Sequence, residues 1–376
     1  MRIAMIGHKH FGTREGGVEV VVTELAKRMA ALGHEVTCYD RSGSDVMIGH
    51  AIESSERVVD GVRIVPVKTI DKKGFAAASA SYNATKAAIA DKPDVIHFHA
   101  EGPCACLPMA QRAGIRTVAT IHGLDWQRAK WGKLGSAYIK HGERVAVKSA
   151  DEIIVLSRSA QEYFEQTYNR KTVFIPNGMD PKESRPANEI RQRWGLEDGS
   201  YILFLGRLVP EKRPELLIDA FKNIETDKRL VIAGGSSDTS EYEQQLHEQA
   251  KSDPRVLFTG FVTGEPLAEL YSNAYCYVLP SDVEGMPMSL LEAMAYGCAC
   301  VTSDIPECSD VLDGAGVSFA QGDANSLQRS VESLLANPPY VKWLGEAAKE
   351  HVTKDNDWSN IVRQTLNAYS RAYRGF

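Results

Sequence analysis

Long hydrophobic runs are missing from the 376-residue sequence, and this absence bears on where the protein resides. A membrane-spanning helix needs roughly 20 consecutive apolar residues, and no stretch approaches that length. The apolar run from Met1 to Gly7 is too short for the core of a signal peptide. We therefore expect a cytoplasmic protein, either free or peripheral on the inner face of the cell membrane.

A basic excess is also missing. Lysine and arginine number 43 against 49 aspartates and glutamates, for a formal net charge of −6. Proteins whose main partner is nucleic acid usually carry a domain-wide basic excess, so nucleic acid is excluded as the principal partner. The fractions of hydrophobic residues, 43%, and charged residues, 24%, are those of an ordinary globular protein.

Cysteine is scarce and lacks the spacing of a metal site. The seven cysteines are odd in number, and most lie inside apolar runs. Two Cys-x-Cys pairs have a single residue between the cysteines and no partnering pair of histidines, and this spacing disfavours a zinc site. We expect buried, unpaired cysteines and no metal ion.

The sequence does contain a regular alternation of short apolar runs with segments whose apolar residues recur at helical spacing. This pattern is typical of parallel strands joined by crossover helices. This predicts an α/β protein with two Rossmann-like domains, whose parallel sheets face each other across a cleft. Apolar density falls between residues 180 and 200, where we place the boundary. The expected domains are residues 1–185 and 186–357, with a last helix over 358–376 that packs back on the first domain.

A pair of acids brackets a helix start after one of the later strands. In Ser281-Asp-Val-Glu-Gly-Met-Pro-Met-Ser-Leu-Leu-Glu292, Glu284 lies in the loop and Glu292 in the second helical turn. Both can face a ligand at the helix N-terminus, where backbone N–H groups and the helix dipole favour a phosphate. The alternative is a favourable first-turn acid together with a solvated glutamate.

A pair of cations follows another strand. Gly206-Arg207-Leu-Val-Pro-Glu-Lys212-Arg-Pro214 puts Arg207 and Lys212 between a strand end and a helix that begins near Pro214. Cations at this edge of a sheet can neutralise a diphosphate as it leaves. The alternative is that Arg207 and Lys212 are merely solvated loop cations. This explanation is less favoured because the cation motif and the acid motif occur together, in this order along the chain.

Together with Ile175-Pro-Asn-Gly-Met-Asp180 and the opening Gly16-Gly17 loop, these motifs resemble the family 4 retaining glycosyltransferases over nearly the whole chain. The resemblance implies the two-domain GT-B fold and catalysis without a metal or other cofactor. The sequence Gly297-Cys-Ala-Cys-Val301 departs from the family's Gly-x-Pro-Val, and Met286 replaces a commoner aromatic or leucine. These departures affect packing more than chemistry.

The resemblance also implies roles for single residues. Glu284 would contact hydroxyls of the donor sugar and Glu292 the ribose, while Arg207 and Lys212 would bind the diphosphate. Backbone near the phosphates would come from the remaining donor-side residues, Gly16, Gly17, Gly285, Met286 and Pro287. The residues expected to act in catalysis are His122, Arg207, Lys212 and Glu284.

The loop from Gly7 to Gly17 resembles the glycine-rich loop of dinucleotide-binding domains, and Asp40 is placed where such domains carry a ribose-binding acid. Lys9 occupies the middle glycine position of Gly-x-Gly-x-x-Gly, so the fingerprint fails. An NAD enzyme is therefore disfavoured.

Histidines end two strands of the first domain. His122 and Asp125 follow one strand, and family members carry a similar histidine near the transferred sugar, although a lone histidine is usually structural. His97 and His99 end the preceding strand, and alternation puts them on the same side. We expect His99, Glu101 and Asp125 to line the acceptor side.

Two further features remain. The segment 126–148 combines two tryptophans with several cations, which suits either an interfacial helix on an anionic membrane or a partly buried aromatic pair with a solvated basic face. Asp355-Asn356-Asp357 mimics a metal-binding motif of another glycosyltransferase fold, but it lies away from any strand end and reads as coincidence.

The sequence therefore predicts a hexosyltransferase that moves a sugar from a nucleoside diphosphate sugar, with UDP the favoured leaving group, to a hydroxyl of a glycan or a lipid-linked acceptor. Retention at the anomeric carbon rests on the resemblance alone. Two alternatives stay open: a nucleotide-sugar epimerase of the same fold, and a nucleotide-sugar-binding protein without catalysis.

Overall fold

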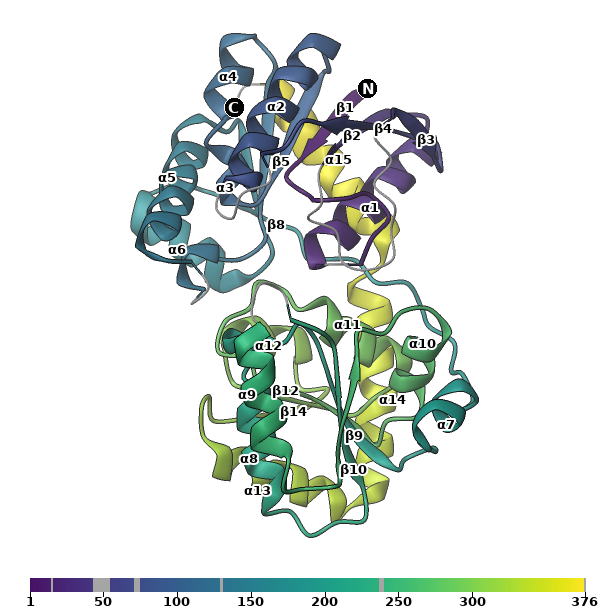
Figure 1. Cartoon of the computed structure of the whole chain (residues 1–376). Coiled ribbons are helices and arrows are strands. Elements are labelled where there is room, and N and C mark those ends of the chain that lie inside the picture. Colours follow the sequence, from purple (N-terminus) through teal and green to yellow (C-terminus); the bar gives the residue numbers. More distant parts are fainter. Residues whose placement is uncertain (15, 43–54, 71–74, 129–130, 237–239, 375–376) are drawn as a thin grey trace. The chain divides into compact units, whose positions relative to one another are not determined.

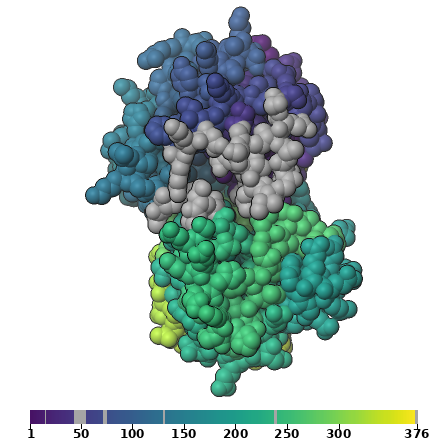
Figure 2. Space-filling view, in the orientation of Figure 1, coloured from purple at the N-terminus to yellow at the C-terminus, as the bar shows by residue number. Residues whose placement is uncertain are grey.

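The chain forms two compact units, which Figures 1 and 2 colour along the sequence. The first comprises Met1–Gly178 with Trp358–Phe376, and the second comprises Met179–Asp357. The computed structural model describes residues 1–14, 16–42, 55–70, 75–128, 131–236 and 240–374.

The expected boundary between residues 185 and 186 falls inside the second unit. The backbone N–H of Arg185 donates to Ser272 Oγ at 3.0 Å, and its carbonyl accepts from Asn273 Nδ2 at 2.8 Å. Both partners belong to the second unit, so the chain is already packed there before residue 186. The low apolar density of this segment reflects an extended surface strap rather than a linker.

The first unit is built on an eight-stranded sheet of order β3-β4-β2-β1-β5-β6-β7-β8. Its neighbouring strands are parallel except for the β3–β4 hairpin. Central strands are buried on both faces, as parallel sheets require. The strands are β1 (Arg2–Ile6), β2 (Glu35–Arg41), β3 (Arg57–Val59), β4 (Val62–Val67), β5 (Val95–His99), β6 (Arg116–Ile121), β7 (Glu152–Val155) and β8 (Val173–Phe174).

Helices cover this sheet through apolar faces. In α1, residues Val21, Val22, Leu25 and Met29 recur at helical spacing and are all buried. Figure 1 shows the C-terminal α15, in yellow, beside the purple α1. The helices are α1 (Gly17–Ala31), α2 (Ala76–Asp91), α3 (Glu101–Cys104), α4 (Leu107–Arg112), α5 (Lys133–Ser149), α6 (Arg158–Tyr168) and α15 (Trp358–Arg374), with the 3₁₀ turn η1 (Asp125–Gln127).

The second unit has a six-stranded, fully parallel sheet of order β11-β10-β9-β12-β13-β14. Alternate residues of β9 enter different core clusters, Leu203 in one and Ile202 in the other, so both faces are covered. The strands are β9 (Tyr201–Leu205), β10 (Arg229–Ala233), β11 (Val256–Gly260), β12 (Cys276–Leu279), β13 (Cys300–Ser303) and β14 (Val317–Phe319).

The helices of the second unit begin where the sequence signals predict. Pro214 opens α8, and Asp323 caps α13 by accepting backbone N–H groups of Asn325 and Ser326 at 2.9 and 3.0 Å. The helices are α7 (Glu189–Trp194), α8 (Pro214–Lys222), α9 (Ser240–Ala250), α10 (Glu265–Ser272), α11 (Met288–Tyr296), α12 (Pro306–Leu312), α13 (Ala324–Leu335) and α14 (Pro338–Asp355), with the 3₁₀ turn η2 (Pro210–Lys212).

All seven cysteines are buried and unpaired, as the sequence predicts. Among the described residues, no helix is both long and apolar enough to span a membrane.

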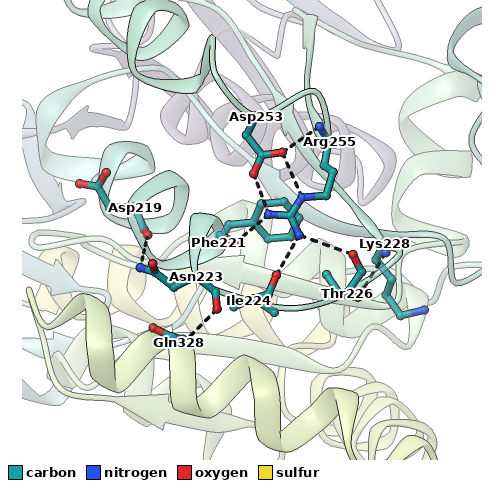
Figure 3. Close-up of polar contacts among 9 residues, drawn as sticks. All are labelled: Asp219, Phe221, Asn223, Ile224, Thr226, Lys228, Asp253, Arg255 and Gln328. Atoms are coloured by element: carbon teal, nitrogen blue, oxygen red, sulfur yellow. Dashed lines mark hydrogen bonds and ion pairs between the residues drawn. The ribbon is translucent and has the colours of Figure 1, made fainter.

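A side-chain clamp holds the loop between α8 and β10 (Figure 3). The guanidinium of Arg255 donates to both carboxylate oxygens of Asp253, at 3.0 and 2.7 Å, and to the carbonyls of Phe221 and Ile224, at 3.3 and 2.8 Å. It also lies over the Phe221 ring, 4.5 Å from the centroid. The hydrogen bonds from Arg255 lower the pKa of the Asp253 carboxyl below its ordinary value. One guanidinium therefore binds a carbonyl in the last turn of α8 and another just after the helix, where carbonyls lack the usual helical partners.

Replacing Arg255 by alanine is expected to lower the free energy of unfolding by about 1–3 kcal/mol, because carbonyls and a carboxylate lose a charged donor. Arg255→Lys should recover only part of this, since an ammonium cannot make the bidentate contact. Urea unfolding of the whole chain measures both. The control is Lys251→Ala, whose exposed pair with Glu248 contributes little. Equal midpoints for Arg255→Ala and Lys251→Ala would contradict the clamp.

Candidate active site

The cation loop and the acid loop meet in the second unit. Strands β9 and β12 are parallel neighbours in the sheet, so the loops after them leave from the same edge. Lys212, at the end of η2, places its Nζ 2.5 Å from Glu284 Oε1. The side chains are 12% and 9% exposed, respectively. Two motifs separated by 72 positions thus form one largely buried ion pair.

Further contacts join the two loops. Ser281 Oγ donates to Glu284 Oε1 at 2.7 Å, so this carboxylate oxygen receives a hydroxyl as well as an ammonium. Arg213 pairs with Asp282, Nη1 to Oδ2, at 2.9 Å, and the backbone N–H of Asp282 donates to the Glu211 carbonyl at 2.8 Å. The acid loop is therefore held to the cation loop by backbone and side chains at once.

Glu292 lies in the second turn of α11, where the sequence predicts it. Its side chain is nearly buried, the residue being 7% exposed, and Oε2 accepts a hydrogen bond from Tyr271 OH at 3.1 Å. The helix begins at Met288, directly after Pro287, and the side chain of this N-cap proline makes no capping hydrogen bond. Its first N–H groups and positive dipole end are suited to an anion.

The remaining donor-side residues of this loop are positioned around that terminus. Arg207 follows β9 after the single residue Gly206 and is partly buried. Gly285 and Pro287 are buried, while Met286 packs against the apolar core of the unit. Gly285, Met286 and Pro287 thus supply backbone and packing, whereas Arg207 supplies a cation.

In the first unit, Gly16 is the N-cap of α1 and Gly17 is its first residue. The carboxylate of Glu19, in the first turn, accepts the backbone N–H of Lys9 at 2.9 Å. This acid partly offsets the positive end of α1, so the terminus is less favourable for a phosphate than that of α11.

Asp40 is occupied inside the first unit. It accepts hydrogen bonds from His8 Nε2 and from the backbone N–H of Phe11, both at 3.0 Å, and pairs with Arg57 at 3.2 Å. Burial alone would raise its pKa, but the hydrogen bond from His8 and these other contacts lower it below the ordinary value. An acid committed to such contacts cannot also bind a ribose, which agrees with the failed dinucleotide fingerprint.

The histidines of β5 and the loop after β6 form one cluster. His99 Nδ1 lies 3.0 Å from His122 Nε2, and the His97 and His99 rings are 4.0 Å apart, on the same side as alternation predicts. His97 also contacts Tyr369 OH at 2.8 Å and Thr120 Oγ1 at 2.7 Å. Burial lowers the pKa of His97 to about 3, that of His122 to about 4 and that of His99 well below its ordinary value. All three rings are therefore uncharged at neutral pH.

The residues expected on the acceptor side lie at different depths. His99 and Glu101 are fully buried, which differs from the expectation that they line a surface, because α3 and neighbouring elements cover the end of β5. Burial raises the pKa of Glu101 well above its ordinary value, and its Oε1 accepts the backbone N–H of Asp125 at 2.9 Å. Asp125 itself is partly exposed and pairs with Arg128 at 2.8 Å. Glu101 thus supports the loop that presents His122 and Asp125.

Much of the basic tryptophan segment faces inward. The buried carboxylate of Glu143 accepts from Trp126 Nε1 at 2.9 Å and pairs with Lys140 at 2.9 Å. It also accepts hydrogen bonds from Tyr163 and Tyr168. Lys140 lies over the Trp126 ring, 3.9 Å from the centroid. Trp126 and Lys140 therefore hold α5 and α6 together, whereas Lys130 lies outside the described residues.

Sequence analysis missed the residues that support the site. Ser281 and Asp282 open the acid motif and Arg213 follows Lys212, so their proximity to the motifs was a usable signal. Tyr271 and Glu143 carry no such signal, because their partners are distant in sequence.

The Asp355-Asn356-Asp357 triplet connects α14 to α15. The carbonyl of Asn356 accepts the backbone N–H of Met179 at 2.7 Å, and Asp355 pairs with His351 at 3.1 Å. In the described parts of the chain, no group of three or more His, Cys, Asp or Glu residues is arranged to hold a metal ion.

Comparison with known proteins extends over both units. The family model for glycosyl transferases group 1 matches residues 186–351, and that for Glycosyltransferase Family 4 matches residues 15–183. An uncharacterized glycosyltransferase of Methanocaldococcus jannaschii is 28% identical, with 99% of this chain and 98% of the relative aligned. A glycogen synthase of Mycobacterium tuberculosis is also 28% identical, over 100% of this chain and 96% of its own.

The fold has close counterparts among solved structures. Anabaena HepE in complex with UDP and glucose superposes with a TM-score of 0.80, at 16% identity, over 98% of this chain and 100% of that one. Because the two family models together match residues 15–183 and 186–351, the protein belongs to the group 1, family 4 glycosyltransferases, which have the GT-B fold.

Proposed function

We propose that this glycosyltransferase moves a hexosyl residue from a UDP-sugar to a hydroxyl of a glycan or lipid-linked acceptor, with retention at the anomeric carbon and without a metal ion. The observation that carries the proposal is the Lys212–Glu284 pair beside the α11 N-terminus. It brings a cation for a diphosphate and a carboxylate for sugar hydroxyls to one edge of the second sheet. UDP and glucose are the molecules in the HepE complex, which supports this donor class.

Each residue has a part in the proposed reaction. Arg207 and Lys212 neutralise the diphosphate as the bond to the sugar breaks, Glu292 accepts hydrogen bonds from the ribose, and Glu284 binds hydroxyls of the transferred sugar. The backbone of Gly285, Met286 and Pro287 leads to the α11 terminus, which faces the phosphates. Gly16 and Gly17 supply further backbone in the first unit.

Two parts of the proposal concern the reacting sugar. His122 contacts the reacting sugar. Asp125 lies on the acceptor side, and the buried residues His99 and Glu101 support it from within the first unit. We favour displacement on the front face, assisted by the departing phosphate, over a covalent intermediate. The product's anomeric configuration, determined by NMR, tests retention.

One assay identifies the donor and separates the proposal from its alternatives. A panel of nucleotide sugars is incubated with and without lipid-linked and soluble glycans, and nucleotide release is followed. A glycosyltransferase releases UDP when the acceptor is present, whereas an epimerase converts the donor without one. A binding protein without catalysis turns over nothing.

Glu292→Ala should weaken UDP binding by about 10- to 100-fold, because a hydrogen bond to a charged group contributes about 1.5–3 kcal/mol and the ribose is present in donor and product alike. Calorimetry with UDP measures this. Glu346→Ala is the control, since Glu346 is an exposed acid of the same unit. Unchanged UDP affinity in a folded Glu292→Ala protein would exclude the ribose contact.

Arg207→Ala and Lys212→Ala should lower kcat by about 10²-fold or more, and by more than they weaken donor binding, because charge on the diphosphate grows in the transition state. Lys222→Ala, which removes an exposed cation of α8, is the control. A chelator should leave the wild-type rate intact. Near-wild-type turnover in both site variants would refute the leaving-group role, and strict dependence on a divalent ion would refute metal independence.

The first unit offers a surface for an anionic membrane on the cytoplasmic side. A groove beside α4 and α5 is lined by Arg112, His141, Arg144 and Lys148, and no Asp or Glu is among its described lining residues. Lys133 at the start of α5 is exposed as well. Each cation near such a surface contributes on the order of 1 kcal/mol.

Binding to anionic liposomes should therefore be strong at low salt and weak at high salt, because salt screens these charges. Changing Lys133, Arg144 and Lys148 to Glu should abolish co-sedimentation, while changing Lys222, Lys251 and Lys342 of the second unit to Glu should not. Lys140 is left intact because Glu143 needs it. Equal pelleting of both variants would indicate that this surface does not dock, and would favour a soluble glycan as acceptor.

A further inference from the structure

The contact between His99 and His122 restricts how the second ring can act. His99 ends β5 and His122 directly follows β6, and these strands are parallel neighbours in register. The ring nitrogens His99 Nδ1 and His122 Nε2 are 3.0 Å apart, so one of them donates a proton to the other. The other nitrogen of His99, Nε2, is fully buried and has no hydrogen-bond partner among the described residues.

Burial of that second nitrogen decides the direction of the hydrogen bond. If His122 donated, His99 would carry its proton on Nε2, where a buried N–H group would lack an acceptor. If His99 donates from Nδ1, its Nε2 is an unprotonated nitrogen instead. Orphaned buried donors are rarer in native proteins than under-satisfied acceptors, so the second arrangement is favoured.

His122 then accepts through Nε2 and carries its own proton on Nδ1. This nitrogen makes no hydrogen bond to the described chain, and it is not among the fully buried atoms that lack a partner. It is therefore the atom through which His122 can reach a ligand. An Nδ1–H group is a hydrogen-bond donor, and its natural partner on a sugar is a hydroxyl oxygen.

We propose that His99 is a positioning residue that holds His122 in its Nδ1–H tautomer, so that His122 donates one hydrogen bond to a hydroxyl oxygen of a bound sugar. The sugar contact rests on the proposed function, whereas the tautomer does not. A hydrogen bond made by one nitrogen of a histidine generally fixes the role of the other.

The backbone around His99 is built to hold this ring in place. Gly7 (φ 123°) is required beside it, since a Cβ there would lie 2.2 Å from the His99 carbonyl oxygen. Ala100 has φ 74° and ψ 162°, a conformation that is essentially reserved for glycine. On the other side, a Cβ at Gly142 would lie 2.0 Å from the Glu101 carbonyl oxygen. A strained turn clamped between two glycines is the kind of rigid support that a precisely oriented side chain needs.

Charges near His122 leave this arrangement intact. Burial is the main cause that lowers the pKa of His122 to about 4; nearby Asp125 opposes the shift and Arg128 adds to it. Burial and the neighbouring rings of His97, His122 and His8 also keep the pKa of His99 far below its ordinary value. Both rings therefore stay uncharged at neutral pH, and the tautomer persists over the physiological range.

Histidine ¹⁵N NMR on the full chain tests the tautomer without any substrate. Long-range ¹H–¹⁵N correlation spectra distinguish protonated from unprotonated ring nitrogens, and His122→Gln assigns the signals. We expect His122 to be protonated at Nδ1 in the wild type. His99→Leu, which removes the donor, should shift His122 toward the Nε2–H form, while His99→Asn, whose amide can donate from a similar position, should retain Nδ1–H.

Kinetics then tests the contact with the sugar. His99→Leu should lower kcat/KM by about tenfold or more, and His99→Asn should recover most of the loss, which a purely structural role would not predict. His97→Leu is the matched control: it removes a buried histidine from the same strand and should leave the His122 tautomer unchanged.

An Nε2–H tautomer of His122 in the wild type overturns the proposal, and so does an unchanged tautomer in a folded His99→Leu protein. Should His99→Leu fail to fold, the wild-type and His99→Asn spectra still decide the tautomer. The expected tautomers with unaltered kinetics would overturn the sugar contact alone, and loss of all transferase activity in the wild-type assay would refute the proposed function instead.

Discussion

The ion pair between Lys212 and Glu284 is the constraint around which the second unit is arranged. It exists because β9 and β12 are parallel neighbours, so that two loops far apart in sequence leave the sheet at one edge. Arg213 with Asp282, and the backbone bond from Asp282 to Glu211, tie the same loops a second time. The positions of Lys212 and Glu284 are thereby set by the sheet from which their loops leave and by the contacts between those loops.

A stabilising role alone does not explain why Lys212 and Glu284 form a nearly buried ion pair. Removing two charges from water costs several kcal/mol per ion, and apolar side chains of similar size often stabilise a protein as well or better. The proposed function gives a nearly buried ammonium and carboxylate another role: a diphosphate would compete with Glu284 for Lys212, and sugar hydroxyls would take over at the carboxylate. Ser281 already donates to Glu284 and would keep one donor on this carboxylate during such an exchange.

The sequence predicted features that depend on local periodicity or strand ends. Alternation in β5 put His97 and His99 on one side, and Pro214 marked the start of α8. The seven cysteines were expected to be buried on the same grounds. The motifs of Lys212 and Glu284 were each placed after a strand, and parallel sheets collect the carboxyl ends of their strands at one edge.

What could not be predicted depends on contacts between distant segments. The packing of the strap after Gly178 on the second unit is one example, because its partners Ser272 and Asn273 lie far along the chain. Composition likewise could not show that Trp126 and Lys140 both contact the buried carboxylate of Glu143.

Burial acts in opposite ways on the charged groups of the two units. In the first unit it suppresses charge: the histidine rings are uncharged and the pKa of Glu101 is raised, so these groups act as hydrogen-bonding groups with fixed donors and acceptors. In the second unit, Lys212 and Glu284 lie against each other as an ion pair although both side chains are nearly buried. Uncharged groups suit the recognition of hydroxyls, whose orientation matters, and opposite charges suit a leaving diphosphate, whose charge grows during the reaction. The division of chemistry between the units thus follows from how each one satisfies its buried polar groups.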